Sequence, residues 1–106
     1  MDFRELKKQS DLSYDIAVAK RNALEKVRTR LVVVYNEHLF RADSETINLI
    51  KTLSEVHTSP FYVLDSNENP VEISNPKEFL QILVQRNQEA ISSYHQMSKT
   101  FEKRND

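Results

Sequence analysis

The stretch Ser74-Asn75-Pro76-Lys77-Glu78-Phe79 carries the clearest local signal in the chain, because it predicts where a long helix begins. Asn75 suits the N-cap position, where its side chain can accept a hydrogen bond from a free backbone N–H group. Pro76 suits the first helical position, and Glu78 the third, from which its carboxylate can reach back to the N–H group of the cap. Apolar residues then recur at intervals of three and four, which predicts a helix over about 76–103. This apolar stripe consists of Phe79, Leu83, Ala90, Tyr94, Met97 and Phe101.

Two short apolar runs precede this helix, at residues 61–64 and 71–73, with a polar loop between them. The chain has no glycine, and the loop holds Asn67 and Asn69. Asparagine adopts a positive φ more readily than most other residues, so we expect it to form the turn. The pattern predicts a β-hairpin over about 61–73. Because an isolated hairpin is only marginally stable, it must pack against a helix or another strand.

A shorter amphipathic segment lies further upstream, where Ile47, Ile50 and Leu53 share one helical face. Asp43 or Ser44 can cap its start. Pro60 disfavours a helical conformation in the residue before it. We therefore predict a helix over about 44–57.

The first forty residues follow alternating steps of three and four from Phe3 onward, which predicts a helix over about 2–40. A second interpretation stays open for residues 31–35. This segment is apolar on every side and rich in β-branched residues, as a buried strand would be. We favour the helix, because Leu31, Tyr35 and Leu39 continue a row spaced by four residues.

Helix length then predicts the shape of the molecule. A helix of 38 residues would span ~57 Å and one of 28 residues ~42 Å, whereas a compact chain of this size has a radius of gyration near ~13 Å. We therefore expect one mainly α domain over residues 1–106. It would be an elongated helical hairpin, a coiled-coil-like stalk of two long helices, with the short third helix and the small β-hairpin at one end. Antiparallel alignment would place Phe3 opposite Phe101 and Leu24 opposite Leu80.

Composition excludes several classes of function. The absence of glycine and cysteine among the 106 residues excludes glycine-rich phosphate loops, disulfide frameworks and thiolate metal sites. The net charge is only −1, but residues 42–78 carry a net charge of −5, so the predicted head is acidic. The charged N-terminal segment has no secretory signal, and the longest apolar run falls far short of a membrane span. We expect a cytoplasmic protein that does not enter a membrane.

Candidate catalytic and metal-binding residues are sparse. His38, His57 and His95 lie far apart, and no two have the spacing that helical metal ligands use. The serines lie in no recognisable nucleophile motif. We therefore predict no catalytic residues, no metal and no cofactor, and expect that the protein is not an enzyme.

The predicted function is that of a non-enzymatic interaction or assembly protein, such as an adaptor, scaffold, chaperone or inhibitor in a cellular or viral machine. Thin apolar seams on the two long helices suit docking against a protein partner or self-association into a homo-oligomer. The expected partner-binding residues are Phe3, Leu6, Leu24, Tyr94, Met97 and Phe101.

An alternative function is a nucleic-acid-binding accessory role for the basic segment of the first helix. Its candidate contacts are Arg21, Lys26, Arg28 and Arg30. Helices that bind nucleic acid usually gather their cations on one face, and these four residues do not share one stripe.

Overall fold

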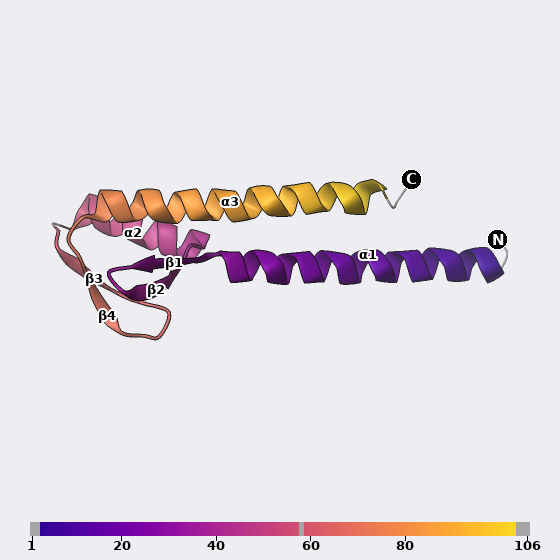
Figure 1. Ribbon diagram of the computed structural model, residues 1–106, viewed down its shortest axis with the longest axis horizontal. Coiled ribbons are helices and arrows are strands. Elements are labelled where there is room, and N and C mark those ends of the chain that lie inside the picture. The colour runs from indigo at the N-terminus through magenta and orange to yellow at the C-terminus, as the bar shows by residue number, and fades with distance from the viewer. Residues whose placement is uncertain (1–2, 58, 104–106) are drawn as a thin grey trace.

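The computed structural model describes residues 3–57 and 59–103, and within them all side chains except those of residues 3, 5–7, 10, 102 and 103. This part of the chain is mainly helical and elongated, with three helices and two small antiparallel β-hairpins. Its principal axes measure 66 × 22 × 22 Å. Figure 1 shows α1 and α3 extending away from the end of the molecule where the hairpins and α2 gather, and we call that end the head. The elements, in chain order, are α1 (Phe3–Arg30), β1 (Val32–Tyr35), β2 (His38–Arg41), α2 (Ser44–Val56), β3 (Phe61–Leu64), β4 (Pro70–Ile73) and α3 (Pro76–Lys103).

The first helix is shorter than predicted, because α1 ends at Arg30 and not near residue 40. Residues 32–41 form the antiparallel hairpin β1–β2, in which Val33 pairs with Phe40. The strand interpretation of residues 31–35 is therefore the right one. A two-residue turn closes this hairpin at Asn36 and Glu37, whose φ angles of 49° and 68° are both positive. Turns of this kind suit the twist of a hairpin, but they are usually signalled by glycine, which this chain lacks.

The second hairpin, β3–β4, confirms the prediction for residues 61–73, with Phe61 paired to Ile73. Its loop differs in detail from the prediction. The residue with a positive φ is Glu68, at 64°, and not an asparagine. The backbone N–H groups of Asn67 and Asn69 instead donate to Asp65 Oδ1, each over 2.9 Å. The Asp65 carboxylate thus organises the loop from within.

The two later helices begin at the predicted caps. Asp43 Oδ1 accepts a hydrogen bond from the Thr46 N–H group over 2.9 Å at the start of α2. At the start of α3, Asn75 Oδ1 accepts one from the Glu78 N–H group over 3.2 Å. Glu78 bonds back to the cap residue as predicted. The donor is the side-chain amide of Asn75, over 3.3 Å, in place of the predicted backbone N–H group.

The hydrophobic core lies in the head, where the two hairpins and α2 pack against the first turns of α3. Phe79 is fully buried at its centre. Its ring stacks on Tyr35 of β1 at a centroid distance of 4.4 Å and meets Phe40 of β2 edge-on at 4.8 Å. The buried members of this core are Val33, Phe40, Ala42, Ile50, Phe61, Val63, Val71, Ile73, Phe79 and Leu83.

Candidate interaction surfaces

The helices α1 and α3 lie side by side only over part of their length. Close to the head, the Arg30 guanidinium donates to Ser93 Oγ across the pair. Ala23 of α1 and Ala90 of α3 are both buried. Further from the head, Met97 and Phe101 line a shallow hollow together with Ala19 and other residues of α1.

This arrangement corrects the predicted register. The alignment of Leu24 with Leu80 is wrong, because Leu80 packs against the core of the head. Asn87 also lies within reach of the head, where its side-chain amide donates to the Ala42 carbonyl over 3.0 Å. The physical reason is that the head takes up the start of α3. The first turns of this helix pack against the hairpins and α2, so only the later part of α3 lies beside α1, and Phe101 faces Ala19 and Asn22.

One consequence is that α1 extends beyond the end of α3, as Figure 1 shows. The last described side chain of α3, Phe101, lies near Ala19 and Asn22. Residues 3–18 form the N-terminal ~24 Å of α1, and the turns nearest the N-terminus extend past the described end of α3. We call residues 3–18 the α1 overhang.

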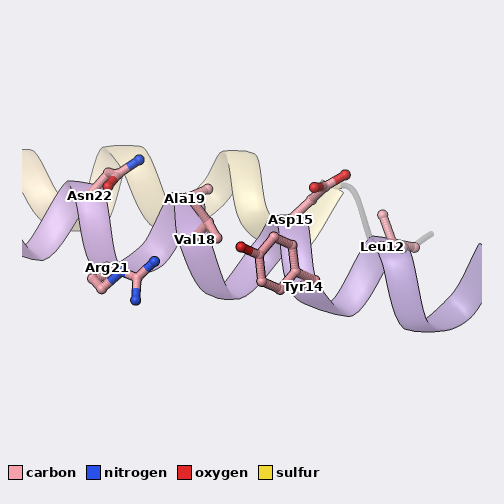
Figure 2. A pocket seen from close by; sticks show the side chains of 7 residues that line it. All are labelled: Leu12, Tyr14, Asp15, Val18, Ala19, Arg21 and Asn22. Atoms are coloured by element: carbon pink, nitrogen blue, oxygen red, sulfur yellow. The ribbon is translucent and has the colours of Figure 1, made fainter.

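The α1 overhang bears exposed apolar side chains. Leu12 is exposed, and 69% of Tyr14 is open to solvent. Figure 2 shows a pocket on this helix whose lining side chains all come from α1. A hollow lined by one helix is a shallow surface feature, which suits contact with another chain better than enclosure of a small molecule. Its lining residues are Leu12, Tyr14, Asp15, Val18, Ala19, Arg21 and Asn22.

The structure brings together some of the predicted partner-binding residues and separates others. Met97 and Phe101 are half-buried and line one hollow beside α1. Leu24 and Tyr94 are half-buried elsewhere on the two helices. The predictions for Phe3 and Leu6 fall on side chains outside those that the structure describes.

The predicted basic segment divides between different sides of α1. All four cationic side chains are exposed. Arg30 donates to Ser93 of α3, and Lys26 lines the hollow that contains Met97. Arg21, by contrast, lines the pocket in Figure 2 that extends from the α1 overhang to Asn22. The segment therefore does not present one continuous basic face.

The described residues include no group of three potential metal ligands, and their histidines lie in three separate surroundings. His38 Nδ1 lies 2.7 Å from Asp65 Oδ2, which joins β2 to the loop of the second hairpin. The Ser66 N–H group donates to the Leu39 carbonyl over 2.8 Å beside it. The hydrogen bond from the Asn69 backbone, helped by those from His38 and Asn67, lowers the pKa of Asp65. This pair therefore connects the two hairpins.

Sequence reasoning missed an apolar surface on the head. In β3, Phe61 and Val63 point into the core, whereas Tyr62 and Leu64 remain 67% and 63% exposed. A two-stranded hairpin can bury only one face against a single core, so alternate residues of an apolar strand must face outward. The continuous apolar run at residues 61–64 was the available signal.

Comparison of the chain with protein-family models, with curated proteins and with solved structures gives no match. Among the described residues, no helix combines the length and the apolar character needed to cross a membrane.

Proposed function

We propose that this protein is a non-enzymatic assembly protein that binds other protein chains through its two long helices, and that it forms a homo-oligomer. The α1 overhang carries the proposal, because it is a long helical segment with exposed apolar side chains, and its N-terminal turns extend past the described end of α3. Tertiary packing supplies most helix stability in proteins. A second chain that covers the overhang would supply this packing.

The apolar seam of α1 supports coiled-coil-like packing of the helices. Ala23 and Val27 are buried in the part of α1 that lies beside α3. Ala19, Ile16 and Leu12 continue the same row toward the N-terminus, at steps of three and four residues. This row passes beyond the last described side chain of α3 while keeping its apolar character. A partner helix could therefore extend the seam along the same side of α1.

A second copy of the chain suits this surface. Residues 3–18 carry three basic and three acidic side chains, so two copies would meet without a large net repulsion. In a symmetric dimer, each substitution on the seam removes two contacts. Leu12 is 41% exposed, so its loss from both chains would cost about 1.2–2.5 kcal/mol, which weakens dimerisation about tenfold or more.

The proposal can be tested with Leu12→Asn, and Leu49→Asn serves as its matched control. Both leucines are exposed and lie on helices, but Leu49 is on α2 in the head. Light scattering behind size exclusion should give a smaller mass for Leu12→Asn than for the parent chain, and an unchanged mass for Leu49→Asn. Equal masses for the parent chain and Leu12→Asn at all concentrations would contradict the proposal.

Nucleic-acid binding by the basic segment is the second candidate, and the exposure of all four cations favours it. Its division between two sides of α1 makes it weaker than the first proposal. Fluorescence anisotropy with labelled DNA and RNA at low salt is the test. Binding that falls steeply as salt rises would support this function, and a flat titration would contradict it. The cytoplasm stays the predicted location for either function.

A further inference from the structure

The head carries an apolar groove between α2 and the second hairpin, which we call the α2–β3 groove. Exposed and half-buried apolar side chains from both elements line it, and none of its lining residues is charged. Val56, which is 76% exposed, continues the row of Leu49 and Leu53 along α2. The lining residues are Leu49, Leu53, Tyr62, Val63, Leu64 and Pro70.

The spacing of the α2 side chains suits recognition of a helix. Leu49, Leu53 and Val56 are separated by four and three residues, so they form one ridge on the 13-residue helix α2. Tyr62 and Leu64 face outward from β3 on the other side of the groove. An amphipathic helix can lay apolar anchors with the same spacing between such a ridge and such a strand.

The surroundings of the groove are acidic. A second hollow shares Leu64 with the groove, and Glu45 and Glu68 line it. Glu72 is paired with Tyr62 across the hairpin and is exposed on the same face. Arg41 is the single cation among the residues that line the second hollow. The described charges around the groove therefore favour a cationic ligand.

We propose that the α2–β3 groove binds an amphipathic helix of another protein whose polar face is rich in lysine and arginine. This function concerns the head and does not depend on the proposed association of α1 and α3. A second copy of the head would bring two acidic surfaces together, since residues 42–78 carry a net charge of −5. The α1 overhang of another copy has balanced charges and offers the groove no such complementarity. An amphipathic basic helix of another protein would match both the apolar lining of the groove and its acidic surroundings.

A synthetic peptide can test the proposal on the full chain. The probe is a fluorescein-labelled helical peptide of about 14 residues, which matches the length of α2, with leucines on one face and lysines on the other. The control peptide has glutamate in place of every lysine. We expect anisotropy to show binding of the lysine peptide, weakening as salt rises, and no binding of the glutamate peptide.

Variants of the chain locate the site. Leu49→Asn and Leu64→Asn should each weaken binding of the lysine peptide about tenfold or more. Val34→Asn is the matched control, because Val34 is 66% exposed on the other hairpin. Leu12→Asn should also leave peptide binding unchanged, which separates this proposal from the one for the α1 overhang. Glu45→Gln combined with Glu68→Gln should weaken binding and reduce its dependence on salt.

Several outcomes would overturn the proposal. These are no binding of the lysine peptide, equal binding of both peptides, or equal effects of the groove variants and Val34→Asn. Circular dichroism confirms that each variant is folded, which is expected because the substituted side chains are exposed. If Leu49→Asn or Leu64→Asn lowers the mass of the chain in light scattering, the groove is an interface between copies and the proposed basic partner is wrong.

Discussion

Replacing Phe79 with alanine is expected to lower the free energy of unfolding by about 3–5 kcal/mol. Phe79 has no exposed surface, and its ring contacts Tyr35 and Phe40 at centroid distances of 4.4 and 4.8 Å. Alanine would remove the ring from the place where the first hairpin meets α3. The expected loss combines the transfer of the missing atoms to water with the cavity that they leave.

Such a loss is a large part of the stability of a small protein, which is about 5–15 kcal/mol. Urea unfolding followed by far-ultraviolet circular dichroism measures it, and Ile91→Ala on the exposed surface of α3 is the control. If Phe79→Ala does not fold, Phe79→Leu should still fold with a loss of about 1–2 kcal/mol. A loss below about 1 kcal/mol for Phe79→Ala would refute the placement of this ring at the centre of the core.

Two further predictions concern the hairpins. The pKa of Asp65 is lowered from 3.8 in the folded chain, so this carboxylate stabilises the fold above that pH, and the contribution is lost as the pH falls through the lower folded pKa. Asp65→Asn should flatten this acid-induced part of a plot of unfolding free energy against pH, and an unchanged plot would contradict it. Glu37 adopts a φ of 68°, so Glu37→Gly should raise the free energy of unfolding by up to about 1 kcal/mol. A lower free energy of unfolding for Glu37→Gly, measured by urea titration, would argue against the positive-φ turn.

Local signals predicted the later elements of the chain well. Asn75 caps α3, Asp43 caps α2, and the second hairpin lies where its apolar runs predict. Each of these elements begins or ends at residues whose side chains bond to the nearby backbone. These bonds join residues only a few positions apart, so they can be predicted from the local sequence.

The first hairpin was harder to predict for an equally physical reason. Leu31, Tyr35 and Leu39 fit a helical row, and the turn at Asn36 and Glu37 has no glycine to mark it. Val33 and Phe40 are buried because they pack in the core around Phe79. That contact joins residues far apart in the sequence, so local patterns do not show it. The predicted alignment of the stalk failed for the same reason, because Leu80 packs against this core and not against Leu24.

The candidate surfaces were only partly accessible to sequence reasoning. Met97 and Phe101 line a hollow beside α1 of the same chain, and their binding of a partner stays a prediction. The α2–β3 groove could not be predicted, because it exists only where α2 and the second hairpin pack together. The α1 overhang likewise depends on where the first helix ends.

The most direct test of the proposed assembly is the absolute mass of the chain in solution, measured by light scattering behind size exclusion over a range of concentrations. We expect a mass of at least two chains of 12.5 kDa, which Leu12→Asn reduces toward one chain. A mass of one chain for the parent protein at every concentration would contradict it.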